Sequence, residues 1–351
     1  MKKHFKIAGL AVLLVVGSAL LLTAAGPPPV ATNLERLGMH LYKDKNLSLY
    51  QNQSCQTCHH PLAGFADPKN HLDPYVNVVS VGSDGFSLGG RNAPTAAYAG
   101  YSPIRYQDTN GDWFGGMFWD GRATGDTLGD PLAEQAQGPP LNPVEMALKN
   151  KPAVIKVIKA AAYYDLWIKV FGPIGNIDDA YDNFGRAVAA YERSRQVTSF
   201  SSKFDTAVDQ FTAAEERGME LFSTHCISCH PITAALGASS ALFTTYGYAN
   251  IGVPANPEVP SPDLGLGGDV EDPDQDGKFK IPTLRNVAMT APYTHNGGIP
   301  TLSDMVWFIN DSSEVEPDVD RNMVDKDTVG NLGFSEEEIE DLVAFLNTLT
   351  D

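Results

Sequence analysis

The fold is decided by two short stretches that share one pattern, CQTCH at residues 55–59 and CISCH at residues 226–230. In each stretch two residues separate a pair of cysteines, and a histidine follows the second cysteine directly. This pattern is the attachment signature of c-type haem, in which the thiols add to the haem vinyl groups and the histidine binds the iron. The two stretches contain every cysteine of the chain, namely Cys55, Cys58, Cys226 and Cys229.

Three other arrangements also use four cysteines. An exported chain often pairs them in two disulfides, but here each pair is followed by its own histidine. A zinc ribbon sets its two pairs roughly 15–20 residues apart, whereas residues 59–225 lie between the pairs of this chain. A thioredoxin-like dithiol occurs once, in a βαβ context. We therefore predict two covalently bound haems c, with His59 and His230 as iron ligands.

The first 25 residues have the layout of a bacterial export signal. Lys2, Lys3 and Lys6 precede an almost wholly apolar stretch at residues 7–25. About 20 apolar residues can also span a bilayer, so an uncleaved membrane anchor is the alternative. We expect a cleaved signal peptide and a periplasmic protein.

The chain of 351 residues is strongly acidic, with a formal net charge of −18. Removal of residues 1–25 with their three lysines takes this charge to −21. Such a charge argues against nucleic acid and against an anionic membrane surface as partners, and it favours a basic protein such as a small cytochrome c. A dimer is one candidate for the oligomeric state.

The two halves of the chain open alike. TNLERLGMHLY at residues 32–42 aligns without a gap with TAAEERGMELF at residues 212–222. Both begin with Thr-x-x-Glu, the capping box of a helix start, and continue with apolar residues at helical spacing. We expect a mainly α fold of two cytochrome c-like haem domains, residues 26–200 and 201–351, with long irregular loops and few short strands.

Other segments complete this expectation. A third capping box at Ser335 predicts a closing helix, and further helices are expected at residues 142–169 and 179–195. The acidic segments 108–112 and 272–277 are interpreted as solvated turns, because the second one lacks the glutamate at the twelfth position of a calcium loop. Irregular chain is expected at residues 61–112, 231–278 and 311–333.

Stretches outside the cysteine motifs add a resemblance to bacterial di-haem cytochrome c peroxidases and the MauG superfamily. They are GRNAPT at 90–95, FWDGR at 118–122, LAEQA at 132–136, NPVEM at 142–146, PTLRNVA at 282–288 and TAPYTHNG at 290–297. The resemblance implies a peroxide site at the N-terminal haem and a C-terminal haem that relays electrons. The superfamily includes MauG and MbnH, which oxidise tryptophan residues of a partner protein.

By that resemblance, His59 is the proximal ligand of the peroxidatic haem, and Gln135 and Glu145 line its distal face. Splitting peroxide requires a proton to move from one oxygen to the other, and a desolvated carboxyl group can make both transfers. Without the resemblance, Glu145 would be interpreted as a solvated residue at a helix start. Trp119 matches the tryptophan between the two haems that carries electrons, whereas an isolated tryptophan would be interpreted as core packing.

The resemblance also implies a calcium ion between the haems. Asn92, Thr290 and Pro292 match the residues that bind it, the last two through their backbone carbonyls, and calcium accepts such oxygen ligands. Arg122 and Arg285 are candidates for pairing with haem propionates, with surface salt bridges as the alternative.

One departure from the family concerns the N-terminal haem. Many members carry a distal histidine that blocks its iron in the resting state, and the corresponding residue here is Asp84. The nearest histidine, His71, lies 13 residues earlier. We therefore expect an N-terminal iron whose sixth position is open without prior reduction.

A second departure concerns the C-terminal haem, at the position where the family supplies methionine, or tyrosine in MauG. That position is Ile309, whose side chain cannot bind iron. Either this haem is five-coordinate or a neighbouring side chain binds it, the candidates being Met305, Met323 and His295. Loss of a methionine ligand lowers the reduction potential, which weakens electron uptake from a cytochrome c.

The predicted function is a peroxidase that reduces hydrogen peroxide to water at the N-terminal haem. A small cytochrome c or similar redox protein supplies the electrons through the C-terminal haem. One alternative is a MauG-like or MbnH-like enzyme that uses peroxide to oxidise tryptophan residues of a partner protein. The other is a non-catalytic electron-transfer cytochrome.

A pyridine haemochrome assay on the purified protein tests the cofactor prediction. We expect two haems c per chain that stay with the polypeptide in acidic organic solvent, because each is bound by two thioether bonds. Haem that extracts into the solvent would contradict the prediction.

Overall fold

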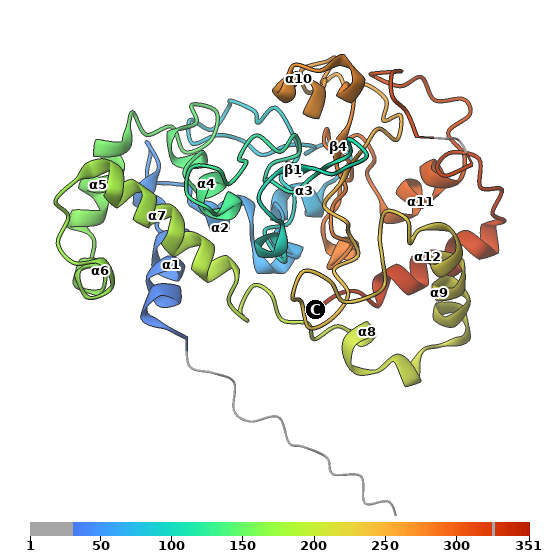
Figure 1. Ribbon diagram of the computed structural model, residues 1–351, viewed down its shortest axis with the longest axis horizontal. Coiled ribbons are helices and arrows are strands. Elements are labelled where there is room, and N and C mark those ends of the chain that lie inside the picture. Colours follow the sequence, from blue (N-terminus) through green and yellow to red (C-terminus); the bar gives the residue numbers. More distant parts are fainter. Residues whose placement is uncertain (1–30, 325–326) are drawn as a thin grey trace, which may run out of the picture. The chain divides into compact units, whose positions relative to one another are not determined.

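The computed structural model describes residues 31–324 and 327–351, and most of its regular structure is helical (Figure 1). The α-helices are α1 (Asn33–Lys43), α2 (Cys55–Cys58), α3 (Pro68–Leu72), α4 (Pro131–Ala136), α5 (Lys151–Ala160), α6 (Tyr164–Phe171), α7 (Ile177–Glu192), α8 (Lys203–Thr206), α9 (Ala213–His225), α10 (Leu266–Val270), α11 (Leu302–Asn310) and α12 (Glu336–Asn347). The strands are β1 (Tyr106–Gln107), β2 (Trp113–Phe114), β3 (Tyr248–Ala249) and β4 (Phe279–Lys280). Single turns of 3₁₀ helix lie at Lys45–Leu47, Pro61–Ala63, Ala99–Tyr101, Pro139–Leu141, Val208–Gln210, Pro273–Gln275 and Val287–Met289.

The three predicted capping boxes are confirmed. At the start of α1, the hydroxyl of Thr32 accepts from the amide of Glu35 at 3.2 Å, while the Glu35 carboxylate accepts from the amide of Thr32. Thr212 and Ser335 begin α9 and α12 in the same way. These reciprocal bonds satisfy amides that a helix start leaves without intrahelical partners.

The helix predicted over residues 142–169 is wrong in its extent. Residues 142–150 form turns, and helix begins only at α5, where the Asn150 side chain accepts from the amide of Ala153 at 3.1 Å. Pro152 suits this first turn because its missing N–H would have no intrahelical partner there. The helix ends before Ala161, and α6 begins anew at Tyr164. The helix predicted at 179–195 is confirmed as α7, shifted by two or three residues.

Two pairs of helices repeat one packing arrangement, α1 against α7 and α9 against α12 (Figure 1). Each pair touches at a glycine of the repeated sequence. A methyl group on Gly38 would lie 1.9 Å from the carbonyl oxygen of Ala187, and one on Gly218 would lie 1.9 Å from that of Asp341. Only glycine permits backbones to approach this closely, so the sequence repeat is a repeat of helix packing.

Two large hydrophobic cores follow from these pairs. One gathers apolar side chains of α1, α5, α6 and α7, and the other gathers those of α9, α11 and α12. Residues 32–351 nevertheless pack as one compact unit. The Tyr246 hydroxyl, for example, donates to the carbonyl of Tyr98 at 2.7 Å. The fold is thus two cytochrome c-type domains, mainly α, and the domain boundary at residue 200 stays a prediction.

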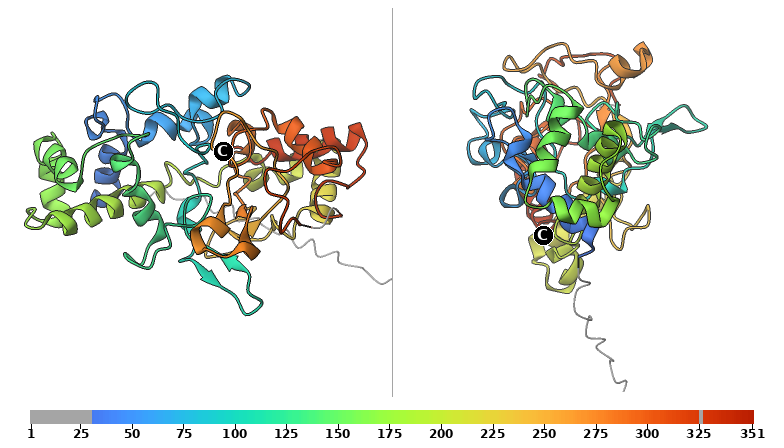
Figure 2. Two further views of the ribbon diagram at one scale, coloured as in Figure 1. Left: turned by 90° about the horizontal axis from the view of Figure 1, so that it is seen from above. Right: turned by 90° about the vertical axis from the view of Figure 1, so that its left-hand side faces the viewer.

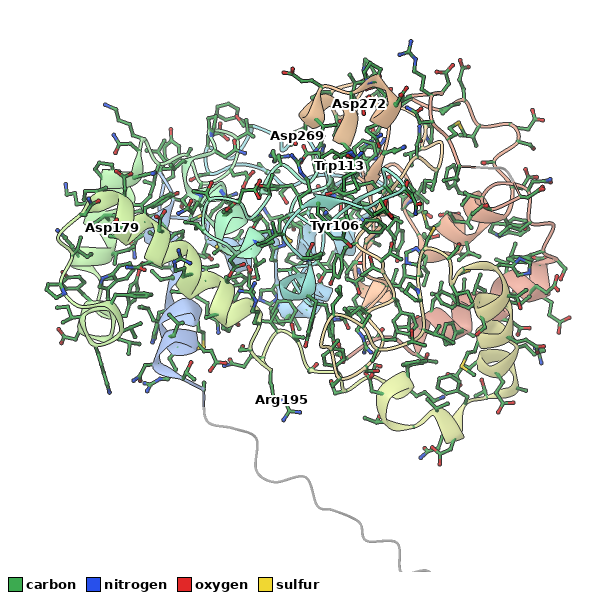
Figure 3. All side chains as sticks on the ribbon, in the orientation of Figure 1. Tyr106, Trp113, Asp179, Arg195, Asp269 and Asp272 are labelled. Carbon is green, nitrogen blue, oxygen red and sulfur yellow. The ribbon has the colours of Figure 1, made fainter. Side chains whose placement is uncertain are left out.

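The sheet structure is limited to two small antiparallel pairs, β1 with β2 and β3 with β4. The β1–β2 hairpin projects outward (Figure 2). Figure 3 labels Tyr106 and Trp113 on this hairpin, and Asp269 on α10. Arg105, just before β1, pairs with Asp269 and so ties the base of the hairpin to α10.

The acidic segments that we interpret as turns are turns in the structure. In the β1–β2 hairpin, Asp108 accepts from the amides of Asn110 and Asp112 at 2.8 and 2.9 Å. Asp272 accepts from the amide of Asp274 at 3.0 Å. Asp and Asn side chains commonly close turns in this way.

The export signal predicted for residues 1–25 lies outside the described residues. Within residues 31–324 and 327–351, no helix has both the length and the apolar character that a membrane span requires.

The close approach at Gly218 can be tested by Gly218→Ala. The added methyl group must push α9 away from α12, so we expect unfolding free energy to fall by about 1–3 kcal/mol, the usual cost of overpacking. Gly175→Ala is the matched control, because a methyl group there meets nothing within 4 Å. Denaturant unfolding of the haem-loaded protein measures both, and equal midpoints for the two variants would contradict the packing.

Candidate functional site

The first cysteine motif presents a histidine with one nitrogen already engaged. Cys55 and Cys58 lie on the single turn of α2, and His59 follows. The Nδ1 atom of His59 lies 3.2 Å from the carbonyl oxygen of Phe65, and burial lowers the pKa of the imidazole. A carbonyl can only accept, so Nδ1 carries the proton and Nε2 is the nitrogen available to iron.

The second motif repeats this arrangement. Cys226 caps the C-terminus of α9, and the Nδ1 atom of His230 lies 2.7 Å from the carbonyl oxygen of Phe243. Burial lowers the pKa of His230 to about 4. Phe65 and Phe243 both adopt left-handed backbone angles, with φ of 63° and 51°. Each half therefore offers a neutral imidazole in a fixed orientation, as an iron ligand requires.

A cavity of about 310 Å³ lies beside the second motif. Cys226, Cys229 and His230 line it, and so do side chains of α11 and the C-terminal end of α12. Both cysteines and His230 thus line one mostly apolar space. These residues fit a haem attached through two thioether bonds.

Several residues predicted from the resemblance line this same cavity, namely Trp119, Asn92, Thr290 and Pro292. The indole N–H of Trp119 donates to the carbonyl oxygen of Asn92 at 2.9 Å. Two residues later, the carbonyl of Pro94 faces the imidazole of His59. The short segment 92–94 therefore connects Trp119, at the second motif, with the histidine of the first.

Glu145 lies near enough to the first motif for its charge to act on both cysteines. Burial raises the pKa of its carboxyl group, and Asn142 donates to its Oε1 at 2.6 Å. Burial also raises the pKa of the Cys55 and Cys58 thiols, with the charge of Glu145 as a further cause in both cases. This carboxyl group is half-buried beside the haem attachment residues, so the interpretation of Glu145 as a solvated residue is wrong.

Gln135 lies near the end of α4 and is half-buried. The chain just after it is held by Tyr181, whose hydroxyl donates to the carbonyl of Gln137 at 2.5 Å. Burial raises the pKa of Tyr181, and the charge of Cys55 adds to that effect. The end of α4 therefore approaches the first motif, on which Glu145 also converges.

The side chain of Asp84 stabilises a turn. Its carboxylate accepts from the amides of Phe86 and Ser87 at 3.0 and 2.9 Å, and the hydrogen bonds of Ser87 and Phe86 lower its pKa. The neighbouring amide of Ser83 donates to the carbonyl of Glu145 at 2.7 Å, so this turn lies next to the glutamate. His71 lies on α3, and its buried Nδ1 has no hydrogen-bond partner among the described residues.

The two arginines differ. Arg122 is exposed and pairs at 2.6 Å with Asp120, which is buried. For Arg285 the surface interpretation is wrong, because this side chain is fully buried and forms a bidentate pair with Asp205 at 2.6 and 2.8 Å. Its Nε also donates to the carbonyl of Ala241 at 2.7 Å. A buried guanidinium requires such complete pairing.

The structure also distinguishes between the candidate ligands of the C-terminal iron. Ile309 and Met305 line the cavity from α11, and His295 lines it from the loop before that helix. Met323 instead forms a β-bridge with Asn250.

Comparison with known proteins matches both halves of the chain. The sequence model described as "Di-haem cytochrome c peroxidase" matches residues 32–213, and one for cytochrome c matches residues 215–350. The chain is 37% identical to the methylamine utilization protein MauG of Paracoccus denitrificans, over 95% of this chain and 93% of that protein. The chain belongs to the di-haem cytochrome c peroxidase and MauG family. Membership implies two c-type haems.

Two further relatives represent the peroxidase branch of the family. The cytochrome c peroxidase Ccp of Escherichia coli is 30% identical, over 92% of this chain and 60% of that protein. The structure of the diheme peroxidase BthA from Burkholderia thailandensis superposes with a TM-score of 0.78 at 30% identity, covering 93% of this chain and 88% of that one. The chain is therefore similar to both branches, MauG and the peroxidases.

Some contacts of the site could not have been predicted from any pattern in the sequence. The carbonyls of Phe65, Phe243 and Pro94 act through the backbone, which any residue type supplies. Asn142 could have been found, because it precedes Glu145 by three residues in a turn and amide side chains commonly bond at that spacing.

Proposed function

We propose that this protein reduces hydrogen peroxide at its N-terminal haem with electrons that pass through its C-terminal haem. The observation that carries the proposal is the half-buried Glu145 beside Cys55 and Cys58. A non-catalytic cytochrome has no use for a carboxyl group at this place. When bound, the haem supplies the iron that accepts peroxide and the electrons that split it.

Glu145 moves the protons. Reduction of one peroxide to two waters consumes two electrons and two protons, and cleavage of the O–O bond requires a proton on the departing oxygen. Asn142 holds Oε1 of Glu145, which leaves Oε2 to take the proton from one peroxide oxygen and deliver it to the other. The raised pKa of the carboxyl group brings it closer to working pH, where general acid–base catalysis is most effective. Gln135, an amide, orients peroxide but cannot transfer its proton.

Trp119 serves the electron route. Its ring lines the cavity of the second motif, and its N–H bond to the Asn92 carbonyl joins it to the segment that reaches His59. The donor is a small basic cytochrome c or a similar redox protein, attracted by the acidic chain. A calcium ion held by Asn92, Thr290 and Pro292 would stabilise this junction between the two motifs. The predicted export signal indicates a periplasmic protein.

A second candidate function is oxidation of tryptophan residues on a partner protein. Two observations favour it: Ile309 lines the cavity in place of a methionine, and the chain is 37% identical to MauG. Without a thioether ligand the C-terminal haem has a lower potential, and it accepts electrons from a cytochrome c less readily.

The variant Glu145→Gln tests the peroxide chemistry. We expect unchanged haem content and a reaction with peroxide that is slower by about 10²-fold, because the amide cannot move a proton. The rate of the natural protein should depend on a group with a pKa above the ordinary value of 4.5, and the variant should lose this dependence. Stopped-flow absorption measures both. Gln135→Ala is the comparison, with a smaller loss expected, and an undiminished rate in Glu145→Gln would sink the assignment.

Steady-state turnover separates the two candidate functions. A peroxidase oxidises many equivalents of reduced cytochrome c per chain when peroxide is present, and Glu145→Gln should slow this turnover by about the same 10²-fold. If the protein reacts with peroxide but oxidises no cytochrome, and mass spectrometry finds oxidised tryptophan on a protein encoded nearby, the second function holds.

A further inference from the structure

The helix α11 covers the C-terminal haem site with hydrocarbon. Four of its side chains line the cavity, Leu302, Met305, Val306 and Ile309. Their spacing of three, one and three residues places them on one face of the helix. Three of the four are pure hydrocarbons, so Met305 is the one side chain on this face that carries an atom able to bind iron.

Met305 lies in a different place from the residue that the family uses. It precedes Ile309 by four residues, which is about 6 Å along the helix axis. Helical side chains all lean toward the N-terminus, so the side chains of Met305 and Ile309 stay about one turn apart. Cys226, Cys229 and His230 would hold the haem in one place, so an iron that faces Ile309 would not also meet that sulfur.

The ring of His295 is already engaged in a stacking contact. Its ring stacks on Phe279 with 3.5 Å between ring centres and 7° between planes, and the guanidinium of Arg91 lies 5.5 Å from the centre of the Phe279 ring. The backbone carbonyl of His295 also accepts from the amide of Asn92 at 2.8 Å. Binding iron through His295 would require this stack to separate.

We propose that the C-terminal haem has an open sixth position facing Ile309 and binds small neutral ligands there, of the class of carbon monoxide and nitric oxide. The hydrocarbon face of α11 suits an uncharged diatomic molecule, whereas an anion placed against it would lose its hydration without a replacement. The protein therefore holds two ligand-binding haems, where a thioether at position 309 would leave one. This inference does not depend on which reaction the N-terminal haem performs.

Titration of the fully reduced protein with carbon monoxide tests the inference, followed by absorption spectroscopy. We expect two molecules bound per chain. In Ile309→Met a thioether reaches the iron, and binding should fall to one per chain. The swap nearly conserves volume, and a haem assay verifies that the variant is loaded.

Met305→Leu is the matched control from the same helix face. It removes the other sulfur, and we expect it to leave both the spectrum and the two-per-chain stoichiometry unchanged. The proposal is overturned if the natural protein binds one molecule per chain, whether Met305→Leu then raises the number to two, which would make Met305 the ligand, or leaves it at one. Binding of two molecules by Ile309→Met would also overturn it, because Ile309 would then not face the iron.

Discussion

The structure depends on one hydrogen bond that each half makes, between Nδ1 of the haem-binding histidine and a backbone carbonyl. In the C-terminal half this is the 2.7 Å contact of His230 with Phe243. The carbonyl is itself held in place, because the buried Arg285 binds the carbonyl of Ala241 two residues earlier and pairs with Asp205. The guanidinium also lies 4.7 Å from the ring centre of Phe200. A fixed imidazole would orient a haem bound to it, and the other side chains of the site would act around that haem.

Around this constraint the two halves diverge, although their framework is repeated. The glycines Gly38 and Gly218 bring the helices together in the same way in both halves. In the first half, the charge of a half-buried carboxyl group, Glu145, acts on both cysteines. In the second half, the corresponding space is covered by the hydrocarbon side chains of α11. The two halves therefore differ in the side chains near their cysteine motifs, a carboxyl group in one half and an apolar helix face in the other.

Much of this arrangement could be predicted from the sequence. The cysteine motifs and the capping boxes at Thr32, Thr212 and Ser335 could be recognised in the sequence, because their contacts form between residues three or four apart. The helix predicted from residue 142 failed because Asn150 and Pro152 start a new helix within an apolar stretch that looked continuous. Burial of Arg285 could not be predicted, since its partner Asp205 lies 80 residues away. The backbone carbonyls that orient His59 and His230 could not be predicted either, because any residue type supplies such a carbonyl.

We propose, as the central claim, that the N-terminal haem is ready for peroxide in the resting, oxidised protein. Asp84 is the residue expected where many relatives carry a blocking histidine, and its carboxylate accepts hydrogen bonds within a turn. The most direct test mixes the fully oxidised protein with hydrogen peroxide, without any reductant, and follows the absorption of the haems within the first second. The account predicts an immediate change at one equivalent of peroxide. An oxidised protein that stays unchanged, and reacts only after reduction, would contradict it.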